Sequence, residues 1–286
     1  MLRQVRKLRP GCTLTVDASG MRVDQYYRAP IADSSQAATS DELQSLIDDI
    51  VTEQMVADVE VGALLSGGVD SSAIVASMCR VTEPSNITTF CATVEMPDTG
   101  ADNFGADENF ATSVAESFGI KLIKVPTDAD LINSLQDMVW SLDEPTADFS
   151  ALQTLFLARA ARENGIKVLM SGVGGDDLFT GYGRHTAALA YAAFNKVPGL
   201  RHVIGAVAGL FSSGSIIGRR IKRTGNLLRL DEESMLADAM SFSAVGAGRR
   251  LDLMAPNLRS EVPADGIPAA FRKSFEATQG LNSVER

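Results

Sequence analysis

The chain has 286 residues, of which 45% are hydrophobic and 22% charged, a composition typical of a globular protein with room for one large or two smaller domains. Its formal net charge of −10 argues against sequence-independent nucleic-acid binding, which requires a basic surface. The three cysteines, Cys12, Cys79 and Cys91, have no metal-binding or redox spacing, and the last two are expected to be buried thiols. The N-terminus lacks the apolar core of a signal peptide. These features predict a cytoplasmic protein with neither a nucleic-acid nor a membrane partner.

The N-terminal region reads as a separate small unit. Residues 13–16 and 21–28 predict two short strands around a turn at Ala18-Ser19-Gly20. Small residues at 29–39 predict a linker. A helix is then expected from Thr39, because Thr39 and Glu42 have the spacing of a capping box.

From residue 61 onward, predicted strands alternate with predicted helices. The strands are expected at 61–65, 87–94, 120–125 and 166–171, and the helices at 71–80, 107–118, 128–142 and 149–164. Trp140 fits a core position of the third helix. This alternation predicts an α/β fold, with a parallel sheet covered by helices on both faces and ligands bound at the carboxyl ends of its strands.

The most apolar stretch, residues 203–217, is interrupted by glycines and serines and is too short to span a membrane. It predicts a buried or loosely packed helical segment. Four basic residues follow at Arg219, Arg220, Lys222 and Arg223. A solvated helix face is the simplest interpretation of this cluster, and a membrane-surface or partner-binding role stays open.

Residues 61–72 join an apolar strand to a helix through a turn of glycines and hydroxyls. Gly67 and Gly68 allow the backbone to approach a phosphate closely, and the helix start contributes N–H groups and partial positive charge. Hydroxyl donors come from Ser66, Ser71 and Ser72. Asp70 would repel a bare phosphate, so it is interpreted as a ligand of Mg²⁺ carried by that phosphate. A Walker A loop is excluded, because the chain has no Gly-Lys pair.

Residues 170–185 repeat this arrangement after another strand. Gly172, Gly174 and Gly175 are followed by the paired carboxylates Asp176 and Asp177. A solvated acidic turn is the alternative for this segment alone. Together the two turns predict one Mg-pyrophosphate held between Asp70 and Asp176.

The first turn resembles the pyrophosphate loop of the N-type ATP pyrophosphatases. Further segments match motifs of one family in the same order and spacing as this turn. They are Phe90, Asp107-Glu108, residues 143–148 (Asp-Glu-Pro-Thr-Ala-Asp) and residues 171–182 (Ser-Gly-Val-Gly-Gly-Asp-Asp-Leu-Phe-Thr-Gly-Tyr). Over about residues 40–190 the chain therefore resembles the C-terminal synthetase domain of glutamine-dependent asparagine synthetases. The resemblance implies a PP-loop (adenine-nucleotide alpha-hydrolase-like) domain at 40–286. It also implies a remnant of the glutaminase domain at 1–28, a linker at 29–39, and a longer parent protein.

The resemblance also implies an activity. ATP would adenylate the side-chain carboxylate of aspartate, and ammonia, taken from glutamine in the full-length parent, would displace AMP to give asparagine. Leu65 and Ala92 would line the adenine, and Ser171 and Gly172 would contact the nucleotide. The pyrophosphate and Mg²⁺ would be held by Ser66, Gly67, Gly68, Asp70, Ser71 and Ser72. The implied catalytic residues are Asp70, Asp176 and Asp177, the implied metal ligands are Asp70 and Asp176, and a homodimer is compatible with the sequence.

Two positions depart from the family's pattern. Val173 stands where the family usually has an acid, and Asp177 where it usually has Glu. Cys12 is not assigned as a glutaminase nucleophile, so the chain alone is not expected to hydrolyse glutamine. The alternatives are another carboxylate-adenylating enzyme, such as a β-lactam synthetase-like or cell-surface polysaccharide amidotransferase, or a catalytically impaired nucleotide-binding module. For three further features the sequence leaves both a structural and a site role open: Asp143-Glu144, Asp107-Glu108 and His185.

Overall fold

The computed structural model describes residues 5–28, 38–93, 104–127, 131–144, 146, 148, 150–211, 216–240, 251–259, 267 and 269–278. The chain divides into two compact units, Met1–Ala38 and Thr39–Val284. Residues 29–37 of the expected linker lie outside the described residues.

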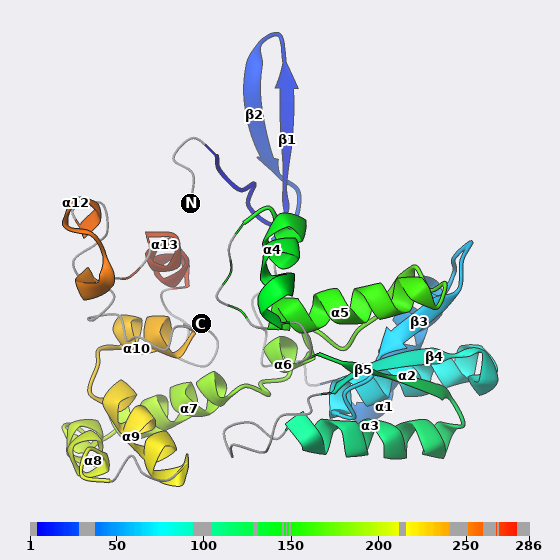
Figure 1. The fold of residues 1–286 in the computed structure, drawn as a ribbon. Coiled ribbons are helices and arrows are strands. Elements are labelled where there is room, and N and C mark those ends of the chain that lie inside the picture. The colour runs from blue at the N-terminus through cyan, green and yellow to red at the C-terminus, as the bar shows by residue number, and fades with distance from the viewer. Residues whose placement is uncertain are drawn as a thin grey trace. The chain divides into compact units, whose positions relative to one another are not determined.

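The first unit contains a β-hairpin. Strand β1 (Cys12–Asp17) pairs antiparallel with β2 (Gly20–Gln25), as the sequence predicts (Figure 1). The second strand ends three residues earlier than expected, because the N–H groups of Tyr26 and Tyr27 both donate to the carbonyl of Gly11 instead of extending the ladder. The Asp17 carboxylate accepts the backbone N–H of Ser19 at 2.7 Å and thereby closes the turn.

The second unit begins with helix α1 (Ser40–Gln54), and the expected capping box is confirmed. The Glu42 N–H donates to Thr39 Oγ1 at 3.2 Å, and the Thr39 N–H donates to Glu42 Oε2 at 2.8 Å. Both bonds satisfy N–H groups that a helix start leaves without a partner.

The central sheet has four parallel strands: β3 (Val61–Leu64), β4 (Thr88–Thr93), β5 (Lys121–Pro126) and β6 (Val168–Met170). Their spatial order is β5-β4-β3-β6. The chain first builds outward from β3 to β5 and then returns to add β6 on the other side of β3. Strand order therefore reverses between β3 and β6, which is the place where open α/β sheets form their ligand crevice.

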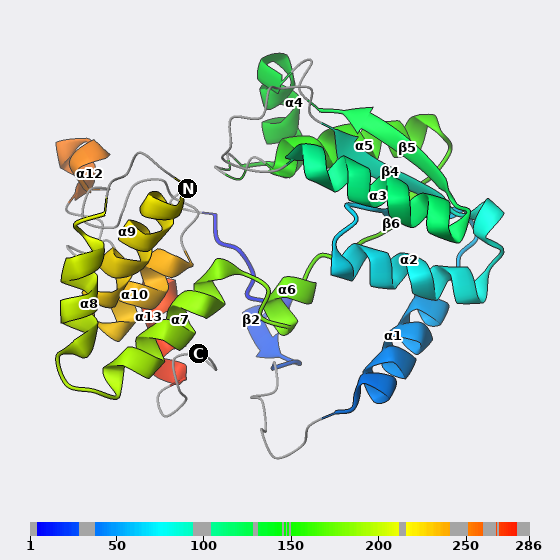
Figure 2. The same cartoon turned by 90° about the horizontal axis from the view of Figure 1, so that it is seen from below.

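Helices cover both faces of this sheet, so the predicted fold class is confirmed (Figures 1 and 2). On one face α1, α2 (Val69–Val81) and α3 (Phe104–Phe118) contribute side chains such as Val75 and Ala111 to a core with Leu65. On the other face α5 (Ser150–Glu163) packs Leu157 against Phe90. A short 3-10 turn, η1 (Pro84–Asn86), precedes β4.

The prediction for Trp140 is wrong. Trp140 is 84% exposed, although it lies in α4 (Leu131–Leu142) as expected. The buried side of α4 carries Ser134 and Met138, and Trp140 is two residues beyond Met138, which places it on a different side of the helix. Of the expected buried thiols, Cys91 is buried and Cys79 is half-buried.

The remaining described helices follow the second glycine turn: α6 (Gly175–Leu178), α7 (Gly183–Asn195), α8 (Leu200–Ala208), α9 (Ile216–Leu228), α10 (Glu232–Ala239), η2 (Leu251–Leu253), α12 (Pro256–Arg259) and α13 (Ala269–Ala277). Tyr191, Leu228 and Met235, from α7, α9 and α10, form a separate hydrophobic core. The expected segment 203–217 belongs to two helices, α8 and α9, and residues 212–215 between them lie outside the described residues.

Of the basic cluster, Arg223 is exposed and Lys222 half-buried, whereas the side chains of Arg219 and Arg220 lie outside the description. Among the described helices, none has the length and apolar character needed to cross a bilayer.

Candidate nucleotide-binding site

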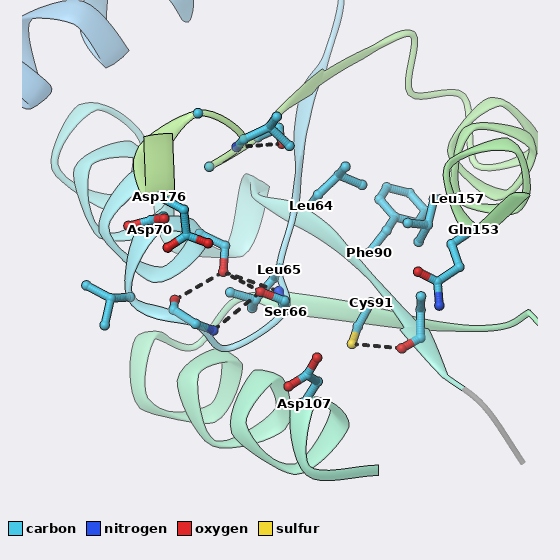
Figure 3. Close-up of a pocket in the computed structure, with 18 of the residues that line it drawn as sticks. Leu64, Leu65, Ser66, Asp70, Phe90, Cys91, Asp107, Gln153, Leu157 and Asp176 are labelled. Carbon is cyan, nitrogen blue, oxygen red and sulfur yellow. Dashed lines mark hydrogen bonds between the residues drawn. The ribbon is translucent and has the colours of Figure 1, made fainter. Parts of the chain in front are cut away.

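The two glycine turns meet because β3 and β6 are adjacent parallel strands. The first turn follows β3 and the second follows β6, so both emerge at the same edge of the sheet. A Cβ atom added to Gly172 would lie 2.7 Å from the Ser71 nitrogen, and one added to Gly175 would overlap the Asp70 carboxylate. The turns are therefore in contact, and Asp70 and Asp176 line one cavity (Figure 3).

The first turn is stabilised by its own hydroxyl groups. Ser71 Oγ donates to the Gly68 carbonyl at 3.2 Å, accepts the Ser66 N–H at 3.3 Å, and lies 3.1 Å from Ser66 Oγ. Gly67 has a φ of +76° and lies against Phe110 and Ala111 of α3, so a side chain there would be both strained and obstructed. The conformation of the turn thus depends on the hydroxyl of Ser71 and on glycine at position 67.

Helix α2 begins earlier than predicted, at Val69, with Gly68 as its N-cap. A glycine cap provides no side-chain acceptor, and the first intrahelical bond described is from the Ser72 N–H to the Gly68 carbonyl. The N–H groups of Val69, Asp70 and Ser71, which precede this bond at the start of α2, therefore remain available to an anion, and the helix dipole adds positive potential. The Ser72 Oγ atom is buried and has no hydrogen-bond partner among the described residues.

The second turn is compact because of its glycines. Gly174 has a φ of +100°, which favours glycine, and the Val173 N–H donates to Ser171 Oγ at 3.2 Å. The Gly181 N–H donates to the Asp176 carbonyl at 3.0 Å, and a Cβ atom on Gly181 would overlap the Asp176 carboxylate. Glycines of this segment thus lie against both aspartates of the cavity.

The cavity has a volume of about 520 Å³ and two chemically distinct ends. The polar end is formed by the two turns. The other end is apolar and is formed by Leu64, Phe90, Ala92 and Leu157, together with Gln153.

Most residues expected at the site line this cavity. They are Leu65, Ser66, Gly68, Asp70, Ser71, Ala92, Ser171, Gly172 and Asp176. Three expected residues, Gly67, Ser72 and Asp177, do not line it. The Asp177 carboxylate instead accepts a hydrogen bond from the Arg184 guanidinium, which lies 4.0 Å from the centre of the Tyr182 ring. Val173 lines the cavity and is 90% exposed.

Asp107 enters the cavity from α3, and burial raises the pKa of its carboxyl. Burial also raises the pKa of the neighbouring Cys91 thiol to about 11, with the charges of Asp107 and Glu108 acting in the same direction. Cys91 is therefore a neutral thiol near neutral pH and is not an activated nucleophile. Glu108 pairs with Lys124 at 2.7 Å, as befits a structural residue.

The other candidates do not line this cavity, although His185 contacts Tyr182, which does. Asp143 and Glu144 line a second cavity of about 620 Å³ together with Trp140. His185 stacks obliquely on Tyr182, with 5.9 Å between ring centres, and its buried Nδ1 atom has no partner among the described residues.

Sequence reasoning missed Gln153 and Leu157. Their spacing of four residues within the expected helix 149–164 is the signal that could have placed them on one face. Within the described ranges, no three His, Cys, Asp or Glu side chains are arranged to bind a metal.

The sequence profile of the asparagine synthase family matches residues 42–269. A putative glutamine-hydrolysing asparagine synthetase of Mycobacterium tuberculosis is 34% identical over 269 residues, which cover 91% of this chain and 39% of the relative. Asparagine synthetase 1 (glutamine-hydrolysing) of Bacillus subtilis is 33% identical over 217 residues, which cover 73% of this chain and 33% of the relative. The chain thus spans only about two fifths or less of these curated relatives.

Among solved structures, the NH₃-dependent NAD synthetase of Campylobacter jejuni is 12% identical with a TM-score of 0.36, covering 85% of this chain and 95% of that one. The U34-tRNA thiolase NcsA of Methanococcus maripaludis is 15% identical with a TM-score of 0.37, and the match covers 86% of this chain and 84% of the thiolase. The family match extends over most of the chain and includes both glycine turns, and the chain belongs to the asparagine synthase family.

Proposed function

We propose that this cavity binds ATP and transfers AMP to the side-chain carboxylate of aspartate, and that ammonia then converts the acyl adenylate to asparagine. The observation that carries the proposal is the contact between the two glycine turns, which brings Asp70 and Asp176 to one cavity beside the N-terminus of α2. The polar end suits a triphosphate, and the apolar end suits a purine base.

In the proposed reaction, a carboxylate oxygen of aspartate attacks the α-phosphorus. The bond from this phosphorus to the bridging oxygen breaks, and pyrophosphate leaves. The ammonia nitrogen then attacks the acyl carbon, AMP leaves with the carboxyl oxygen, and nitrogen loses a proton. The chain's contribution is positioning and charge stabilisation through the N–H groups at the start of α2 and the hydroxyl of Ser66, which lines the cavity.

The two aspartates fit a magnesium ion that arrives with the nucleotide. Mg²⁺ is commonly held by one or two carboxylates plus substrate phosphates, and Asp70 and Asp176 supply two carboxylates at the polar end. When bound, the ion would neutralise phosphate charge.

We further propose that residues 1–28 belong to the glutaminase part of a longer protein that supplies the ammonia. This assignment rests on the family's domain order, and the present chain is not proposed to hydrolyse glutamine.

A catalytically impaired nucleotide-binding module is the second candidate. Two observations favour it: Val173 presents an apolar side chain to the cavity, and Asp177 is paired with Arg184 instead of lining the cavity. Such a module would bind MgATP without chemistry.

Binding and pyrophosphate exchange separate these functions. MgATP affinity is measured by calorimetry, and ATP–pyrophosphate exchange is measured with and without aspartate. Asp70→Asn and Asp176→Asn are each expected to weaken MgATP binding at least about tenfold, because a charge-assisted contact is lost. Asp49→Asn, an exposed change on α1, is the control. Aspartate-dependent exchange supports the enzyme, binding without exchange supports the module, and no MgATP binding refutes both.

A further inference from the structure

Gln153 is a polar side chain at the apolar end of the cavity. It lies on α5 one turn before Leu157, and residues four apart share a helix face. Both side chains line the cavity beside Phe90, and Figure 3 shows the Gln153 carboxamide directed into it. Among the described residues, none forms a hydrogen bond with this carboxamide.

The surrounding walls do not distinguish one purine from another. Leu64, Phe90, Ala92 and Leu157 provide apolar contact, which adenine and guanine satisfy about equally well. Cys91 lies on the face of β4 opposite to Phe90, and Asp107 comes from α3, which covers that opposite face. Gln153 comes from α5, the helix that covers the Phe90 face. Discrimination at this end therefore requires a donor and an acceptor on the Phe90 side.

A carboxamide has that pair of groups. Its oxygen accepts and its NH₂ donates, and the two lie side by side. Adenine presents the complementary pattern, an amino donor at N6 next to an acceptor at N7, whereas guanine presents two acceptors, O6 and N7. With adenine the carboxamide forms two hydrogen bonds, and with guanine its oxygen faces another acceptor.

We propose that Gln153 contacts the nucleobase and makes this site select adenine over guanine. The inference rests on the proposed ATP site and adds to it a residue that determines base specificity. The apolar side chains contact the faces of the purine ring, and the Gln153 carboxamide forms hydrogen bonds with N6 and N7 at its edge.

The test compares the dissociation constants of MgATP and MgGTP for the wild-type chain and Gln153→Leu. Leucine keeps a similar volume and removes both hydrogen-bonding groups. The wild type should prefer ATP, and the substitution should lower the ATP-to-GTP affinity ratio about tenfold, the effect typical of one lost bidentate contact. Gln136→Leu on α4 makes the same chemical change outside this cavity and should leave the ratio unchanged.

Gln153→Glu is the second variant. It keeps the acceptor for N6 but replaces the donor that N7 requires with a charged oxygen, so ATP binding should weaken although size is preserved. Thermal unfolding checks that each variant folds. An ATP-to-GTP ratio in folded Gln153→Leu within about twofold of wild type overturns the role of Gln153 alone, as does an unchanged ATP affinity in folded Gln153→Glu or a wild type without preference. A wild-type chain that binds neither nucleotide overturns the ATP site as well.

Discussion

The turn after β3 and the turn after β6 both bring glycines and an aspartate to one cavity, yet they are held in different ways. The first is held by its own hydroxyl bonds through Ser71 and continues into α2, a helix of 13 residues that packs in the core. The second continues into α6, a helix of four residues, and its glycines lie directly against Asp70 and Ser71 of the first turn.

Because of this difference, the position of the second turn depends on that of the first. The first turn has its shape from local hydrogen bonds and from a helix that the core fixes. The second turn depends on close contact with the first, because a four-residue helix contributes little stability by itself. Substitutions at the contact between the turns should therefore act on nucleotide binding, whereas loss of the Ser71 hydroxyl, which holds the first turn together, should act on folding stability.

Gly175→Ala should have the largest effect. The added methyl group would overlap the Asp70 carboxylate, and overpacking of this kind costs about 1–3 kcal/mol or separates the two turns. We expect MgATP affinity to fall about tenfold or more, measured by calorimetry.

The matched control is Gly183→Ala, at the start of α7. A Cβ atom there meets nothing within 4 Å, so this change should leave affinity unaltered and slightly favour the helix. Equal affinities for Gly175→Ala and the wild type would show that the contact between the turns does not position Asp70.

Much of this arrangement could be predicted from the sequence, because it is encoded in short-range patterns. The capping box at Thr39 and the strand–glycine–helix order around Gly67 are local, and the alternation of strands and helices implies a parallel sheet. Placing both turns at strand ends followed from that alternation. The adjacency of β3 and β6 required strand order, which no local pattern specifies.

The errors and omissions share a physical cause. Helical periodicity predicts a core position for Trp140 because it identifies an apolar side without saying which neighbour covers that side, and α4 buries Met138 instead. Gln153 was missed because a polar residue on a helix ordinarily faces solvent. Only the tertiary position of α5 over Phe90 brings it to the cavity.

Ser71→Ala should have an intermediate effect, on stability. The hydroxyl donates to the Gly68 carbonyl and accepts the Ser66 N–H, so its removal takes this partner from the Ser66 N–H and leaves the Gly68 carbonyl with only the Ser72 N–H. We expect the free energy of unfolding to fall by about 1–2 kcal/mol, measured by urea denaturation.

Ser171→Ala, in the second turn, provides the comparison. Its hydroxyl accepts one bond, from the exposed Val173, so its loss should cost about 0.5 kcal/mol or less. If Ser171→Ala were the more destabilising of the two, the first turn would not be the self-supporting one.

The smallest expected effect concerns the helix behind the first turn. Asp48 of α1 accepts hydrogen bonds from Ser77 Oγ and Arg80 Nη1 of α2, each at 2.6 Å. The Ser77 bond is the main cause that holds the pKa of Asp48 below its ordinary value of 3.8, and Arg80 acts in the same direction. Because the folded-state pKa is the lower one, the folded chain binds fewer protons than the unfolded chain in this range. The stabilisation is therefore present above pH 3.8 and is lost as the pH falls through the folded-state pKa.

Unfolding in urea at pH 6 and at pH 3 measures this contribution. Asp48→Asn should unfold more easily than wild type at pH 6. The difference between the two proteins should shrink at pH 3, because below pH 3.8 the unfolded wild-type chain binds a proton at Asp48 more readily than the folded chain does. Asp49→Asn changes the adjacent, exposed carboxylate and should follow the wild type at both pH values. No difference between Asp48→Asn and the wild type at either pH would mean that apolar packing alone holds α2. The first turn would then owe its position to the core around Val75 and Met78 rather than to this polar contact between α1 and α2.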